Sequence, residues 1–347
     1  MDHRLNLKLE EDYPHHPDVL EREYSDGGFS RGWAMHAKPI PTRMFDCHIH
    51  YSGGIEGNIL ENIAAEEEAA RELGVTGAMV FLHAYGNGWQ PDLTNKSVMG
   101  IFPYFTLKEL EKALAGFNKS SHTWAAYLDY QSPEPDLVDA VADMGCCCIK
   151  LHNAPVIEKN IPPEIWLGKE WSATFEAIQR RGLAVIIHVT QRLSPSVYTG
   201  GGRNAYWKTG WANGSKYTNE DLLQSFLACC RRFPDINFIG AHQLHLGWER
   251  LDALFAEYPN LFVDTSVGCL LLPNDDFYPH DRDYLRKMFI RHSDRVLFGT
   301  DNFWGSTFFN YNKVNNSNHI RYVTALDLPQ TDLDQIFYKN AERLLGA

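Results

Sequence analysis

The stretch Met44-Phe45-Asp46-Cys47-His48-Ile49-His50 is a short, largely apolar run that ends in two histidines. Seven similar runs follow it, and longer segments with helical spacing of apolar residues separate them. This alternation is typical of βα units that build a parallel sheet. The eight predicted strands are Met44–His50, Gly77–His83, Trp124–Asp129, Cys146–His152, Leu183–Thr190, Asn237–Gln243, Leu261–Val267 and Arg295–Asp301. Eight such units predict an α/β fold, a closed (β/α)8 TIM barrel rather than an open doubly wound sheet.

The chain length agrees with one elaborated barrel. Its 347 residues could hold two domains, but a barrel takes about 250 residues and leaves room for additions. Residues 1–43 are polar and contain several prolines, which predicts an N-terminal arm, and residues 44–347 are expected to form a single barrel domain. Two long connections, Ala84–His122 and Gln191–Thr218, follow strand ends and are predicted as insertions at the barrel mouth. The arm could cover its own barrel or that of a partner, and we expect a homodimer.

Composition excludes several functional classes. The chain is 44% hydrophobic, and its 32 basic residues against 44 acidic ones give a net charge of −12. Such an acidic chain is a poor partner for nucleic acids and anionic membranes. No apolar stretch has the length of a signal peptide or a membrane span. We therefore expect a cytoplasmic protein with a small-molecule substrate, whose seven cysteines stay reduced.

Candidate functional residues lie at the ends of the predicted strands. Side chains two positions apart in a strand share a face, so His48 and His50 can hold one metal ion together. By the same alternation Cys47 points the other way and is not counted as a ligand. Four more strands end in ionisable residues: Lys150, His188, His242 and Asp301. Each alone could be a core residue or a helix cap, but their convergence on one face of a barrel predicts a metal centre.

Seven motifs carry a resemblance to a known family. They are FDCHIH (45–50), CIKLHN (148–153), VIIHVT (185–190), FIGAHQLH (238–245), NLFVDTS (260–266), DRVLFGTDN (294–302) and FYKNAERLLG (337–346). In this order they resemble the amidohydrolase superfamily, and within it the amidohydrolase-related group of metal-dependent hydrolases and decarboxylases. The resemblance runs from Met44 to Ala347 and leaves only the arm uncovered.

The resemblance implies a role for each strand-end residue. His48, His50 and His188 would be metal ligands, and Asp301 would both touch the metal and shuttle protons. His242 would be a ligand or would polarise the carbonyl of the substrate, so His242 and Asp301 are the catalytic candidates. Lys150 takes the place where two-metal members carry a carbamylated, bridging lysine. One or two divalent ions are therefore expected, zinc before manganese or iron.

Four further residues have two possible roles. His152 shares the Lys150 side of its strand and is a candidate for substrate binding. Arg282 could recognise a carboxylate, with a solvated helix start as the alternative. Asp264 could lie near the site or make structural hydrogen bonds only. His83 could line the pocket or be a core histidine with its hydrogen bonds satisfied.

These features favour a metal-dependent hydrolase that acts on a small carbonyl compound: an amide, an ester, a lactone or an activated C–C bond. The alternatives are a lyase of the same fold, either a non-oxidative decarboxylase or a hydratase, and an iron-dependent oxygenase. Similar decarboxylases tend to carry Gly-His-x-Gly-Glu after the sixth strand. Here Gly240-Ala241-His242-Gln243-Leu244-His245 lacks the glutamate unless Glu249 replaces it, which favours the hydrolase. A non-catalytic binding barrel would not require Asp301 beside the full histidine set.

Overall fold

The computed structural model describes residues 41, 43–91, 102–117, 121–190, 216–246, 248–266, 282–305, 320, 323–324 and 326–347. The predicted arm, except for Pro41 and Arg43, lies outside the described residues, as does most of the insertion Gln191–Thr218. Within the first insertion, the described part contains the short strand β3 (Tyr104–Thr106) and the helix α5 (Leu107–Ala113). Among the described helices, none combines the length and the apolarity of a membrane span.

A β-strand overlaps each of the eight predicted strands. These are β1 (Met44–Tyr51), β2 (Val75–Tyr85), β4 (Thr123–Tyr127), β5 (Cys148–His152), β6 (Ala184–His188), β7 (Phe238–Gly240), β8 (Leu261–Asp264) and β9 (Val296–Leu297), and β10 (Asn302–Trp304) follows. Every pair is parallel, and the order is β10-β1-β2-β4-β5-β6-β7-β8-β9. The carboxyl ends of all these strands therefore lie at one end of the sheet.

The two ends of this order meet through the segment between β9 and β10. Strand β9 pairs with β8, whereas β10 pairs with β1. Between them, the Cys47 N–H donates to the Phe298 carbonyl and the Asp301 N–H donates to the His48 carbonyl, each at 2.9 Å. Strands β9 and β10 thus form one interrupted eighth strand, and the predicted (β/α)8 barrel is confirmed.

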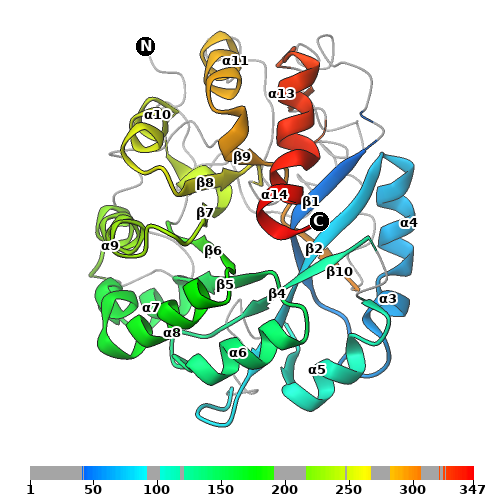
Figure 1. Cartoon of the computed structure of the whole chain (residues 1–347), viewed down its shortest axis with the longest axis vertical. Helices are drawn as coiled ribbons and strands as arrows, with labels where there is room; N and C mark the ends of the chain where they lie inside the picture. The colour runs from blue at the N-terminus through cyan, green and yellow to red at the C-terminus, as the bar shows by residue number, and fades with distance from the viewer. Residues whose placement is uncertain are drawn as a thin grey trace, which may run out of the picture.

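Helices lie around the outside of the strands (Figure 1). They are α3 (Ile59–Asn62), α4 (Ala64–Glu72), α6 (Pro135–Asp143), α7 (Ala154–Glu158), α8 (Lys169–Arg180), α9 (Asn219–Arg232), α10 (Trp248–Glu257), α11 (Arg282–Arg291), α13 (Gln330–Asp334) and α14 (Asn340–Leu345). Helix α9 shows why they form: Thr218 and Asp221 make a reciprocal capping box at its start. Its Leu222, Phe226 and Cys229 recur at helical spacing and are buried in the layer between helices and strands.

The barrel interior has an apolar floor. The strands, together with Ala241 directly after β7, form one cluster of buried side chains: Phe45, Cys47, Met79, Phe81, Ala125, Cys148, Ala184, Ile186, Ile239, Ala241, Phe262 and Leu297. Ala341 and Leu345 of α14 pack against the same cluster, and α14 lies near the centre of the ring in Figure 1. The C-terminal helix therefore closes this end of the barrel, and the polar side chains lie at the other.

Strand β1 departs from strict alternation. Its pairing with β2 shifts register between Asp46 and Ile49, and Cys47 packs in the interior cluster beneath the histidines. The prediction that Cys47 points away from the side of His48 and His50 is therefore wrong. Burial raises the pKa of the Cys47 thiol well above its ordinary value, and Cys47 is absent from the possible ligand groups among the described residues.

Candidate metal centre and active site

Three of the predicted ligands, His48, His50 and Asp301, come together at the carboxyl end of β1. The Nε2 atoms of His48 and His50 each lie 3.2 Å from Oδ1 of Asp301. Ligand atoms about 2.1 Å from a tetrahedral zinc ion lie roughly 3.4 Å from each other, so this spacing fits a metal ion. The Asp301 side chain is 18% exposed, against 0% for His48 and 8% for His50. Asp301 is therefore the member most accessible from outside.

A buried carboxylate sets the orientation of His48. Its Nδ1 donates to Oδ2 of Asp264 at 2.7 Å, and both side chains are fully buried. The proton is therefore on Nδ1, and the lone pair on Nε2 faces Asp301. Asp264 also accepts the backbone N–H of His242 at 2.8 Å. His48, His242 and Asp264 form a second possible ligand group, in which Asp264 already hydrogen-bonds Nδ1 of His48.

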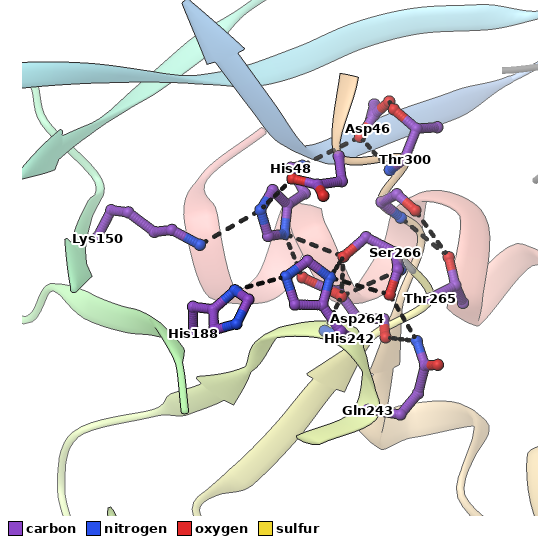
Figure 2. Close-up of polar contacts among 12 residues, drawn as sticks. Asp46, His48, Lys150, His188, His242, Gln243, Asp264, Thr265, Ser266 and Thr300 are labelled. Atoms are coloured by element: carbon purple, nitrogen blue, oxygen red, sulfur yellow. Dashed lines mark hydrogen bonds and ion pairs between the residues drawn. The ribbon is translucent and has the colours of Figure 1, made fainter. Parts of the chain in front are cut away.

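Lys150 reaches the same group from β5. Its Nζ lies 3.3 Å from Nε2 of His48, and Figure 2 shows its side chain pointing toward that ring. Burial lowers the pKa of Lys150 to about 8, although the carboxylates of Asp301 and Asp264 oppose the shift. A fraction of this lysine is thus the neutral amine near neutral pH, the form from which a carbamate can arise.

His242 and His188 extend the cluster on its other side. Nε2 of His242 lies 3.0 Å from Nδ1 of His188, and the rings of His48 and His242 are 5.1 Å apart (Figure 2). The Nδ1 of His242 donates to the Ser266 carbonyl at 3.2 Å, which leaves its Nε2 as the atom with the lone pair. All six predicted ligand residues therefore lie in one continuous cluster.

The two predicted catalytic residues have left-handed backbones. The φ angle is 61° at Asp301 and 59° at His242, and Gln243 and Leu244 continue the left-handed turn at 50° and 58°. Such backbones are uncommon for residues other than glycine and cost about 1–3 kcal/mol each. The turn begins directly after β7. The predicted strand Asn237–Gln243 is therefore too long, and His242 lies in the turn that follows it.

Hydrogen bonds hold these strained backbones in place. Asp46 is fully buried and accepts from the Thr300 hydroxyl at 2.5 Å, from the Thr300 N–H at 3.1 Å and from the His48 N–H at 3.0 Å. Burial raises the pKa of Asp46 to about 7, against the effect of these donors. On the other strained turn, the Gln243 amide donates to the Asp264 carbonyl. Asp46 thus ties the first ligand strand to the turn that carries Asp301 (Figure 2).

His152 is held as a hydrogen-bond donor rather than as a ligand. Its ring stacks on His188 at 4.1 Å, and its Nδ1 accepts the Ala154 N–H at 2.9 Å. The ring proton is therefore on Nε2, and burial lowers the pKa of His152 well below its ordinary value. Arg282 begins α11, but its side chain lies outside the described part of the chain.

Several residues of the cluster were not predicted. The sequence leaves Asp264 between a structural role and a place at the site, and the motifs that contain Asp46, Thr300, Gln243 and Ser266 assign these residues no role. Ser266 could have been found, because it follows Asp264 by two positions at a strand end. The Ser266 hydroxyl lies 3.0 Å from Nδ1 of His242 and 3.1 Å from Nδ1 of His48.

Gly299, between β9 and β10, provides a test of how closely this segment approaches the ligand strand β1. A Cβ at this position would lie 2.9 Å from the His48 Cβ and 3.2 Å from the Cys47 Sγ. We expect Gly299→Ala to displace His48 and to weaken zinc binding by roughly 10–100-fold, the usual effect of disturbing the support of a ligand. Zinc titration against a competing chelator measures this. Gly54→Ala, whose nearest neighbour is 3.8 Å away, is the control, and equal affinities for both variants would contradict the prediction.

Comparisons with known proteins give the family and the fold that this chain matches. A family model described as an amidohydrolase matches residues 45–347. The solved structures that resemble the chain include a dihydroorotase from Campylobacter jejuni, with 13% identity and a TM-score of 0.50 over 88% of this chain and 83% of that one. They also include a 5-carboxyvanillate decarboxylase from Sphingomonas paucimobilis, with 12% identity and a TM-score of 0.54 over 88% and 99%. At these identities the structures show a shared fold alone. A comparison with curated protein sequences gives no match.

Proposed function

The chain belongs to the amidohydrolase family, and from this membership we propose that it is a metal-dependent hydrolase of small carbonyl compounds. The substrate class would be amides, esters, lactones or activated C–C bonds, and one domain, residues 44–347, would carry the activity. Members and structural neighbours are enzymes, both hydrolases and decarboxylases. The observation that carries the proposal is the convergence of His48, His50 and Asp301 within metal-binding distance.

The metal would be a divalent ion, as is usual for this family. His48 and His50 would hold it through Nε2, and Asp301 would hold it through Oδ1. Zinc suits imidazole and carboxylate ligands best, with manganese or iron as alternatives. When bound, the ion would lower the pKa of a water molecule to about 7. Lys150, His188 and His242 are the residues that would complete a second ion position, and we propose that one ion is the resting content.

The other roles follow from exposure and tautomer. Asp301, the most accessible member of the group, would accept the proton of the attacking water and return it to the leaving group. His152 would donate from Nε2 to an oxygen of the substrate. His242, if it holds no ion, would polarise the carbonyl as the imidazolium, because the neutral ring offers only a lone pair at Nε2. Aligned on His242, the Gly-His-x-Gly-Glu motif of similar decarboxylases would place its glutamate at His245, so the glutamate is missing here. This favours hydrolysis over decarboxylation.

Metal content tests the proposal first. We expect about one zinc per chain by inductively coupled plasma mass spectrometry, on protein purified without chelator or added metal. A content of two would indicate that Lys150 is carbamylated and bridging. No metal even after reconstitution would contradict the mechanism.

Product analysis tests the reaction type. The metal-loaded protein is offered lactones, cyclic amides and esters, and carboxylated phenols as the lyase control. We expect hydrolysis of at least one compound of the first group and no carbon dioxide from the phenols. Release of carbon dioxide from the phenols would contradict the hydrolase proposal and support the decarboxylase alternative.

A further inference from the structure

Two buried polar side chains at the barrel mouth do not belong to the metal cluster. His83 lies two residues before the end of β2, and Tyr127 ends β4. The two residues face each other in register, and their rings stack with centroids 4.0 Å apart and planes 16° apart. Sequence alone left His83 between a pocket residue and a satisfied core histidine.

Alternation directs both side chains into the barrel. Phe81 and Ala125, two positions earlier on the same strands, belong to the apolar floor. Because residues two apart share a face, His83 and Tyr127 lie one layer above that floor. Tyr127 is also in register with Lys150. The pair therefore belongs to the same polar layer as the metal ligands.

The pair lies beside the metal centre. The Phe102 ring is 4.9 Å from the His83 ring and 4.9 Å from the His50 ring. Phe102 and Phe303 are parallel within 1°, so flat aromatic faces connect the pair to the first-strand ligands. A planar molecule held at the metal centre would find its other edge near His83 and Tyr127.

The hydrogen-bonding atoms of the pair have no partner among the described residues. Both ring nitrogens of His83 and the hydroxyl of Tyr127 are buried without a hydrogen bond. Buried polar atoms are nearly always paired, and leaving one unpaired is costly. Two phenylalanines would fill the same space without that cost. Three such atoms together are therefore better explained by a ligand that pairs with them.

We propose that His83 and Tyr127 form a second subsite that receives an uncharged oxygen of the substrate, a hydroxyl or carbonyl on a planar ring, and so selects the substrate. This inference rests on the proposed function and deepens it. A neutral imidazole and a phenol each offer both a donor and an acceptor, which suits a hydroxyl or a carbonyl. The atoms of the pair are closed off from solvent, so ligand entry requires a neighbouring side chain to move.

Charge argues against an anion at this subsite. Burial lowers the pKa of His83 well below its ordinary value, so the ring is neutral. Asp129 lies two positions beyond Tyr127 and, after burial, is among the groups that raise the pKa of Tyr104 and Tyr127. The nearby cation of Lys150 is directed at His48. Among the described residues, an anionic group would thus meet the carboxylate of Asp129 while the cation of Lys150 stays directed at His48.

Thermal stability gives a first test that needs no substrate. Tyr127→Phe removes one hydroxyl that has no described partner, so we expect the melting temperature of the metal-loaded protein to stay the same or to rise. The control is Tyr51→Phe, whose hydroxyl donates to the Gly54 carbonyl at 2.7 Å and accepts from Asn62 at 2.8 Å; it should melt lower. A fall for Tyr127→Phe as large as the control would show a structural partner and overturn the subsite.

Substrate discrimination gives the second test. Wild type, Tyr127→Phe and His83→Phe are compared on dihydrocoumarin, an aromatic lactone, and its ring-hydroxylated analogues. In wild type we expect kcat/KM to favour one hydroxylated analogue, and in the variants we expect this preference to fall roughly tenfold, the effect of one lost hydrogen bond, with metal content unchanged. If no compound is hydrolysed, the proposed function fails for lactones. The subsite is then tested by comparing how far the same compounds raise the melting temperatures of wild type and the two variants. The subsite is overturned if wild type prefers no hydroxylated analogue, or if the variants lose the same factor in kcat/KM on every analogue.

Discussion

Asp301→Asn should lower kcat by roughly 100-fold to 10,000-fold, the usual contribution of a positioned acid–base group. The asparagine keeps the size of the side chain and an oxygen that can face His48 and His50. It cannot accept a proton, so the variant should keep its fold and most of its metal and lose turnover. Steady-state kinetics on a compound that the wild type hydrolyses measures the loss of turnover. Metal analysis checks that the metal is kept, and circular dichroism checks the fold.

Asp327→Asn is a matched control for the backbone. Asp327 is also left-handed, with a φ angle of 54° against 61° at Asp301, and it is absent from the metal-binding groups. Its substitution should leave turnover unchanged. If the Asp301→Asn variant is active, Asp301 is not the proton shuttle.

His48→Ala combined with His50→Ala should abolish stoichiometric metal binding. The two imidazoles supply two of the three ligand atoms in the best-formed group. Loss of an outer partner alone costs about 10–100-fold in metal affinity, so loss of two ligands should cost more than ~100-fold. Elemental analysis after dialysis measures the metal that remains.

Two further variants make this result interpretable. Removing His48 leaves the buried carboxylate of Asp264 without one donor, so the alanine variant could unfold. His48→Asn with His50→Asn keeps polar side chains and should fold while still losing metal. His122→Ala with His292→Ala removes two imidazoles outside the metal-binding groups and should keep its metal. Full metal retention in a folded first-strand variant would show that His48 and His50 are not ligands.

Much of the barrel could be predicted because strand and helix patterns are local. All eight predicted strands are present, and five of them bring their ionisable end residues into one cluster. Errors arose where the backbone departs from regular geometry. Strict alternation misplaced Cys47 because β1 shifts register, and His242 was assigned to a strand because nothing in Phe238–Gln243 announces a left-handed turn.

The sequence by itself determined the order of the βα units and the residues at their C-terminal ends, because alternation and helical spacing involve neighbouring residues. Only the tertiary structure decided which side chains support the ligands. His48 and Asp264 are 216 positions apart, and Asp46 and Thr300 are 254 apart. Such pairs meet only when the barrel closes between β9, β10 and β1. The physical reason is that ring closure, rather than any local pattern, buries Asp46 and Asp264 and leaves them to be paired by the nearest donors.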